Sequence, residues 1–281
     1  MNQRSPLAAL ALSLLVGSAA IAEPTGLTYL GSLKIVDASW GFDEPSGLTL
    51  DPGANRVWAV SDDTKRLFRL TTKGEVDLTL KAGVKDLEGV ARLPTGDFAA
   101  VREKSNEIVL VNGDGGGIVR RVKLSEMAGY DAVRTAFEDG PDGKGLEGIA
   151  AHPGGFYVVK EAEPRLLLDI SADLGRIVSA HPLTAEAGFA AKGVSDKKLD
   201  VSGLAHDAGR ERVWIVSDTG SAAFLYDPAA RIVTARYRLA RDSGKTLKNA
   251  EGVEVSADGA QLFVVTDDGE RSVLAVYAIE G

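Results

Sequence analysis

The feature that most constrains this chain is a short anchor, a glycine followed by an aliphatic residue, which recurs along most of its length. The five copies read EPSGL, DLEGV, GLEGI, DVSGL and AEGV, and their glycines are Gly47, Gly89, Gly148, Gly203 and Gly252. The intervals are roughly 40 to 60 residues, a period typical of architectures in which each repeat is one supersecondary unit. Since one such unit cannot bury its apolar faces alone, we expect the units to pack on one another.

Each anchor is followed by a turn and then by a second strand rich in β-branched and aromatic residues. The second strands are predicted at 56–60, 97–101, 155–159, 212–216 and 261–265, and third strands at 66–70, 107–111, 165–170, 223–227 and 272–279. The first four units add a fourth strand, clearest at 76–80 and 232–239. Four-stranded antiparallel meanders at this period indicate the blades of an all-β fold, a β-propeller.

The fifth unit ends after its third strand, so its blade lacks one strand. The segment 27–36 (LTYLGSLKIV) precedes the first anchor and is predicted to supply that strand and close the ring. This count gives a five-bladed propeller. Six blades are the alternative, because insertions at about 124–144 and 183–199 lengthen two units; neither contains another anchor, and we expect both to form loops over one end of the channel.

Residues 1–22 resemble a signal peptide: Arg4 precedes an apolar run at 7–16, and small residues lead to Ala20-Ile21-Ala22. We expect cleavage after Ala22, a propeller domain over 23–281, and a periplasmic or secreted protein; an uncleaved anchor is the alternative. No later segment is predicted to span a membrane. The net charge of −8 disfavours nucleic acid as a partner, and the absence of cysteine excludes disulfides and thiolate metal sites. We expect a monomer.

Carboxylates recur beside the anchors. One residue before the anchor glycines are Ser46, Glu88, Glu147, Ser202 and Glu251, and three residues before them are Glu44, Asp86, Gly145, Asp200 and Asn249. Because strand side chains alternate with period two, both positions are expected to face one side, and equivalent positions of all blades converge on the channel. Crowded carboxylates must protonate, pair with cations or bind metal, and hard oxygen ligands favour Ca²⁺. The alternative is that these side chains hydrogen-bond backbone amides of adjacent blades.

A second acidic set follows the second strands and consists of Asp62, Glu103, Glu161, Asp218 and Asp267. The similar spacing from each anchor favours one shared blade position. Charged residues at strand ends are commonly exposed, so the set is either a solvated rim or a second ring of carboxylates.

The segments EPSGLTLD with RVWAVSDD, KDLEGVARL with FAAVRE, KGLEGIAAH with FYVVKE, and DVSGLAHD with RVWIVSD resemble the SdiA-regulated family of exported bacterial proteins. Related anchors also occur in NHL-type and phytase-like propellers. The resemblance covers about 26–281 and implies a five-bladed propeller with bound calcium. It makes Glu88, Glu147 and Glu251 the leading ligand candidates, with Glu44, Asp86 and Asp200 next. Family members often carry an N-terminal membrane anchor, from which this cleavable start departs, and no settled activity is carried over.

Two functions are compatible with these residues. The first is a calcium-binding envelope protein whose channel mouth recognises a small molecule or a protein partner. The second is a calcium-dependent hydrolase acting on lactones, esters or phosphoesters, with Asp62, Glu103, Glu161 or Asp218 as base. No nucleophile or phosphate-binding motif accompanies the carboxylates, so no catalytic residue is assigned. The histidines, His152, His181 and His206, are expected at the surface.

Overall fold

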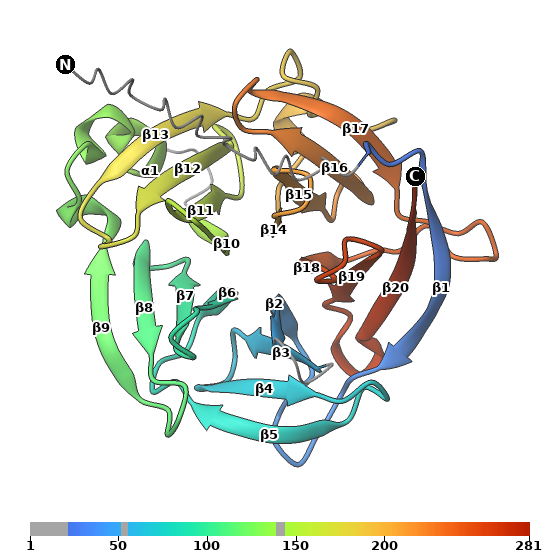
Figure 1. Ribbon diagram of the computed structural model, residues 1–281, viewed down its shortest axis with the longest axis horizontal. Coiled ribbons are helices and arrows are strands. Elements are labelled where there is room, and N and C mark those ends of the chain that lie inside the picture. Colours follow the sequence, from blue (N-terminus) through green and yellow to red (C-terminus); the bar gives the residue numbers. More distant parts are fainter. Residues whose placement is uncertain (1–21, 52–55, 139–143) are drawn as a thin grey trace, which may run out of the picture.

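The computed structural model describes residues 22–51, 56–138 and 144–281, and their strands form five four-stranded antiparallel sheets arranged in a ring (Figure 1). The predicted five-bladed propeller is confirmed. Blade 1 comprises β2 (Pro45–Asp51), β3 (Arg56–Ser61), β4 (Arg66–Leu70) and β5 (Val76–Lys81), and blade 2 comprises β6 (Leu87–Arg92), β7 (Phe98–Arg102), β8 (Glu107–Val111) and β9 (Ile118–Lys123). Blade 3 comprises β10 (Leu146–His152), β11 (Gly155–Lys160), β12 (Leu166–Ser171) and β13 (Ile177–Pro182), and blade 4 comprises β14 (Gly203–Asp207), β15 (Arg212–Ser217), β16 (Ala222–Asp227) and β17 (Ile232–Arg238).

Blade 5 is built from both ends of the described chain. Its strands are β18 (Ala250–Val255), β19 (Gln261–Thr266) and β20 (Val273–Glu280), and the outermost is β1 (Gly26–Lys34). β1 pairs antiparallel with β20, with Leu27 opposite Ile279 and Leu33 opposite Leu274. The expected closure of the ring by the N-terminal strand is therefore confirmed.

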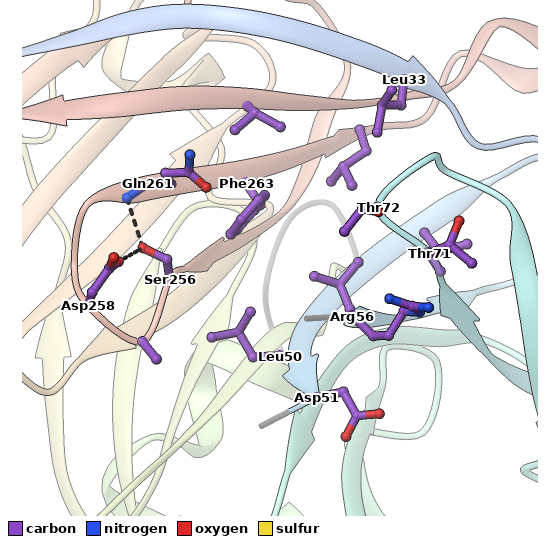
Figure 2. A pocket seen from close by; sticks show the side chains of 15 residues that line it. Leu33, Leu50, Asp51, Arg56, Thr71, Thr72, Ser256, Asp258, Gln261 and Phe263 are labelled. Carbon is purple, nitrogen blue, oxygen red and sulfur yellow. Dashed lines mark hydrogen bonds between the residues drawn. The ribbon is translucent and has the colours of Figure 1, made fainter. Parts of the chain in front are cut away.

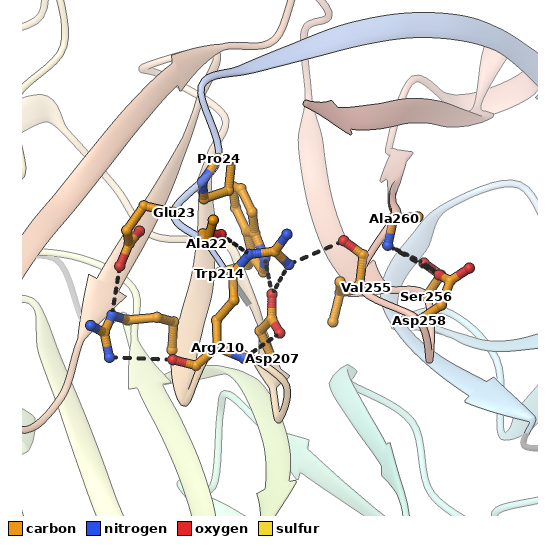
Figure 3. Close-up of polar contacts among 12 residues, drawn as sticks. Ala22, Glu23, Pro24, Asp207, Arg210, Trp214, Val255, Ser256, Asp258 and Ala260 are labelled. Carbon is orange, nitrogen blue, oxygen red and sulfur yellow. Dashed lines mark hydrogen bonds and ion pairs between the residues drawn. The ribbon is translucent and has the colours of Figure 1, made fainter. Parts of the chain in front are cut away.

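The residues just before β1 form hydrogen bonds and an ion pair with blade 4 (Figure 3). The guanidinium of Arg210 donates to the carbonyl of Ala22 at 3.1 Å, Arg212 pairs with Glu23 at 3.1 Å, and the Tyr237 hydroxyl donates to the carbonyl of Pro24 at 2.5 Å. The predicted signal peptide covers residues 1–22. All of it except Ala22 lies outside the described residues.

The core of the described chain lies between blades. Its buried apolar residues form five clusters, each drawing on two neighbouring blades. At the junction of blades 1 and 2, for example, the ring of Trp58 meets that of Phe98 edge to face, with centroids 4.9 Å apart. This is why the aromatic and β-branched second strands are needed: each sheet buries its faces only against its neighbours.

The predicted insertions connect the outermost strand of one blade with the innermost strand of the next. The first contains η1 (Leu124–Glu126), η2 (Tyr130–Ala132) and α1 (Arg134–Glu138), with 139–143 outside the described residues, and the second contains η3 (Asp196–Lys198). Another short helix, η4 (Gly269–Arg271), precedes β20. Both insertions lie at the end of the propeller where the innermost strands begin. Among the described residues, no helix has the length and apolar character needed to cross a membrane.

Candidate metal centre

The five anchor glycines meet at the axis of the ring. A Cβ atom on Gly47 would lie 2.8 Å from the Cα atom of Gly89, and one on Gly89 would lie 2.7 Å from the Cα atom of Gly148. The same contact continues through Gly203 and Gly252 back to Gly47, at 3.0 to 3.1 Å. Only glycine permits backbones to approach so closely. The recurring glycine thus forms a waist at which the innermost strands touch.

This waist divides the channel into two mouths. The cavity at the glycines has a volume of ≈ 10 Å³, which is about the lower limit for one water molecule. We call the end at which the innermost strands begin the acidic mouth, because both acidic sets lie there, and the other end the opposite mouth. A ligand could therefore enter each mouth only from that end of the propeller.

In three of the anchors, the glutamate before the glycine lies in a β-bulge. In β6 the register passes from Leu87 opposite Arg102 directly to Gly89 opposite Val101, so Glu88 has no partner residue. The same irregularity leaves out Glu147 in β10 and Glu251 in β18. Bulges redirect side chains and occur often beside functional sites. The expectation of strict period-two alternation is wrong for these three anchors, because the bulge falls between the two positions; Asp86 even has φ of 60°.

The structure brings members of the two acidic sets together. Carboxylate oxygens of Glu103, Glu147 and Glu161 all lie within 4.8 Å of one another. One oxygen of each is buried, and those of Glu103 and Glu147 have no hydrogen-bond partner among the described residues. The second set is therefore not a solvated rim at blades 2 and 3. We call these three residues the carboxylate cluster.

Burial and mutual repulsion dominate the electrostatics of the acidic mouth. Burial, and then the neighbouring Glu161 and Glu88, raise the pKa of Glu147 well above its usual range. Burial, and then Asp62 and Glu103, raise the pKa of Glu88 to about 7. Burial also raises the pKa of Glu251 well above its ordinary value, followed by the charge of Asp218. A cation at this mouth would relieve the repulsion that these shifts express.

The other predicted ligand positions have different surroundings. Asp86 pairs with Lys104 at 2.6 Å and Arg102 at 3.2 Å, and the hydrogen bond from Lys104 is the main reason its pKa is lowered. Asp200 accepts a hydrogen bond from the Ser217 hydroxyl at 2.6 Å. These two carboxylates are thus occupied by protein groups.

Glu44 lies apart from the carboxylate cluster, in a second acidic group with Asp62 and Asp63. A hydrogen bond with Asp63, then burial, raises the pKa of Glu44 to about 7. Asp63 is exposed and Glu44 is partly exposed, so water reaches this group more freely than the carboxylate cluster.

Sequence reasoning missed Lys144, which lies directly before the third anchor. Its Nζ atom is 3.0 Å from Oε2 of Glu161 and 3.6 Å from Oε1 of Glu103. A lysine beside an otherwise acidic anchor was the available signal. Lys144 pairs with two members of the second acidic set, Glu103 and Glu161. The sequence alone does not show that these residues lie beside the third anchor.

At the opposite mouth, one carboxylate links two blades by accepting backbone hydrogen bonds, which we call stitching. This is the role that was the alternative for the anchor carboxylates. Glu254, two residues after the fifth anchor glycine, accepts hydrogen bonds from the amide of Leu50 in blade 1 at 3.1 Å and from that of Val255 at 2.8 Å. His206 lines the same cavity, of ≈ 180 Å³. The expectation that all histidines lie at the surface is wrong for His181, which is buried between Ser179 and Tyr226.

A separate cavity of ≈ 560 Å³ opens where blade 5 meets blade 1 (Figure 2). Apolar side chains such as Leu33, Leu50 and Phe263 line it, and the carboxylate of Asp258 at its edge accepts a hydrogen bond from the Ser256 hydroxyl at 2.5 Å. None of its lining residues belongs to the carboxylate cluster.

Comparison with known proteins agrees with this architecture. The family model described as SdiA-regulated matches residues 39–268. Among solved structures, glutaminyl cyclase of Myxococcus xanthus is similar with a TM-score of 0.61 at 14% identity, covering 92% of this chain and 100% of the other. A nidogen/laminin complex is similar with a TM-score of 0.51 at 16% identity, covering 83% and 74%. Identities this low bear on the fold alone.

Proposed function

The chain belongs to the SdiA-regulated family, and we propose that it is an exported calcium-binding propeller that uses its acidic mouth to bind a small molecule or a protein of the cell envelope. The observation that carries this proposal is the carboxylate cluster. Oxygens of Glu103 and Glu147 are buried without a hydrogen bond, and Lys144 brings a single positive charge to three carboxylates, so the arrangement is costly unless a further cation completes it.

The donor set fits a hard cation. Glu103, Glu147 and Glu161 offer only carboxylate oxygens, which suit Ca²⁺ and Mg²⁺ better than softer metals. Ca²⁺ is the better fit because it accepts irregular geometry and six to eight oxygens, including waters that an open mouth can supply. Glu88 in blade 2 and Glu251 in blade 5 would contribute further negative charge around the same mouth. Bound calcium would neutralise this charge and offer open positions to a ligand that enters from outside.

The geometry favours binding over hydrolysis. Two of the four candidate bases, Glu103 and Glu161, belong to the cluster that would hold the ion. A third, Asp218, accepts a hydrogen bond from the amide of Asn249 at 2.5 Å. Asp62 is left as the one candidate base, and its buried Oδ1 atom has no hydrogen-bond partner among the described residues. Calcium-dependent hydrolysis is therefore the second candidate, to be tested with lactone and ester substrates with and without Ca²⁺.

The proposal that the protein is exported rests on residues 1–22, which resemble a signal peptide. The proposed cleavage would free Glu23, which is exposed on the surface where the chain enters β1. The expected result is a periplasmic or secreted protein whose N-terminal sequence begins EPTG. A full-length protein retained in the cytoplasm would contradict this part of the proposal.

Calcium binding is tested by melting the mature chain in EDTA and in millimolar Ca²⁺, with calorimetric titration alongside. Calcium at tenfold above its Kd adds about 1.4 kcal/mol to the free energy of unfolding. That corresponds to about 3 °C for a domain of this size. Glu147→Gln keeps the shape of the side chain and should abolish most of the shift. Glu254→Gln, at the opposite mouth, is the control and should retain it. A wild type without binding or a shift would overturn the proposal.

A further inference from the structure

The carboxylate cluster already contains one cation, the ammonium group of Lys144. Its Nζ atom lies 3.0 Å from Oε2 of Glu161 and 3.6 Å from Oε1 of Glu103. These two oxygens and Oε2 of Glu147 are all buried. The ammonium thus occupies the edge of the space that a metal ion would use.

The backbone fixes the place of Lys144. The next residue, Gly145, accepts a hydrogen bond from the amide of Glu161 at 3.2 Å. A Cβ atom on Gly145 would lie 2.4 Å from the carbonyl oxygen of Glu103. The chain therefore runs tightly between the two carboxylate-bearing segments, and Lys144 starts beside both.

One ammonium cannot satisfy the whole cluster. It carries a single positive charge against three carboxylates, and within the described part of the chain its ion pairs reach only Glu161 and Glu103. Its side chain is 45% exposed, so it can swing into solvent without disturbing the core. A divalent ion brings twice the charge and can contact all three carboxylates, which makes it the stronger partner at equal distance.

We propose that Lys144 is a built-in counter-ion that calcium must displace, so that this lysine sets the calcium concentration at which the site fills. This inference rests on the proposed calcium function and adds a specificity-determining residue to it. A tethered ammonium competes as though present at millimolar concentration. The site therefore stays paired at low calcium and loads when the surrounding calcium rises.

The sequence offers a matched control. Lys248 occupies the equivalent position of the fifth unit, four residues before its anchor glycine, and its charge acts on Asp218 at the same mouth. It is exposed, and the described residues include no ion pair for it. Lys144→Gln and Lys248→Gln thus make the same change in net charge but only one removes the competing ammonium.

The experiment is calorimetric titration of calcium into the wild type, Lys144→Gln, Lys144→Arg and Lys248→Gln after treatment with EDTA, at constant salt. We expect Lys144→Gln to bind calcium about tenfold more tightly, since its competitor is gone. Lys248→Gln and the charge-preserving Lys144→Arg should stay within about twofold of the wild type. Melting in EDTA should show a lower stability for Lys144→Gln and a correspondingly larger gain with calcium.

Equal tightening in both glutamine variants would show a general field effect and overturn the inference. An unchanged affinity in Lys144→Gln, even with reduced stability in EDTA, would make the lysine purely structural and also overturn it. Binding by Lys144→Gln alone would support it in its strongest form. If all four folded proteins fail to bind calcium, the calcium function itself fails, which separates that result from the others.

Discussion

Gly47 of blade 1 and Gly89 of blade 2 touch side by side at the axis: a Cβ atom on Gly47 would lie 2.8 Å from the Cα atom of Gly89. Alanine in place of a strand glycine ordinarily stabilises a protein slightly. Here the new methyl group meets backbone, which cannot move aside as a flexible side chain would. We therefore expect alanine to destabilise the protein at these positions instead of stabilising it.

Gly89→Ala is predicted to lower the free energy of unfolding by about 3 kcal/mol, the upper part of the range for overpacking. The measurement is urea denaturation of the mature chain. Gly115→Ala is the control, because a Cβ atom there would meet only Oδ1 of Asn112, at 4.0 Å. Comparable stability of the two variants would contradict the glycine waist.

Stability without calcium is predicted to rise as the pH falls from 8 to 6.5. Burial raises the pKa of Glu88 from 4.5 to about 7, so the folded state takes up protons in this window while the unfolded state does not. The free energy of unfolding gains about 0.8 kcal/mol for one such carboxyl. Below pH 6.5 the lowered pKa of His206, caused mainly by burial, opposes the trend.

Melting curves across this pH range in EDTA and in millimolar calcium would measure the effect. Calcium should reduce the slope, because the bound ion keeps the carboxylates of the acidic mouth ionised. Glu88→Gln should also reduce the slope in EDTA, and the remaining slope would come from groups such as Glu44 and Glu254, whose pKa values are likewise raised to about 7. A profile that is flat in EDTA for the wild type would show that the carboxylates of the acidic mouth do not titrate as proposed.

Glu254→Ala is predicted to cost about 1–3 kcal/mol, because the amide of Leu50 in blade 1 loses its acceptor. Glu254→Gln retains an acceptor oxygen and should cost less than half as much. Chemical denaturation of both variants provides the comparison. Equal stabilities would argue against a stitching role, and a changed calcium affinity in either would contradict the separation of the two mouths.

Deletion of residues 26–34 is predicted to prevent formation of a stable monomer. Removing β1 leaves the eight residues of β20 as an open edge, whose unpaired backbone groups invite association with other chains. Light scattering and melting would detect aggregation or loss of the transition. The control is a chain that lacks only residues 1–21. A monomeric deletion variant with unchanged melting temperature would contradict closure by β1.

The fold was predictable because its information is local and repeated. Anchors, turns and alternating strands lie close together in sequence, and five copies of the pattern support one another. The incomplete fifth unit and the strand-like segment before the first anchor identified closure by β1, because an unfilled sheet edge has few other solutions. The glycines were visible as markers, although their role as a waist follows only from contacts between neighbouring blades.

Local sequence patterns were enough to predict the blades, their number, the strand that closes the ring and the acidic character of one mouth. Tertiary structure decided which carboxylates meet: bulges turn Glu147 toward Glu103 and Glu161, while Asp86 and Asp200 are occupied by nearby cations and hydroxyls. It also decided that Lys144 joins this cluster and that Glu254 stitches two blades. The physical reason is that strand patterns depend on neighbours along the chain, whereas charge pairing depends on distances of a few ångströms between blades.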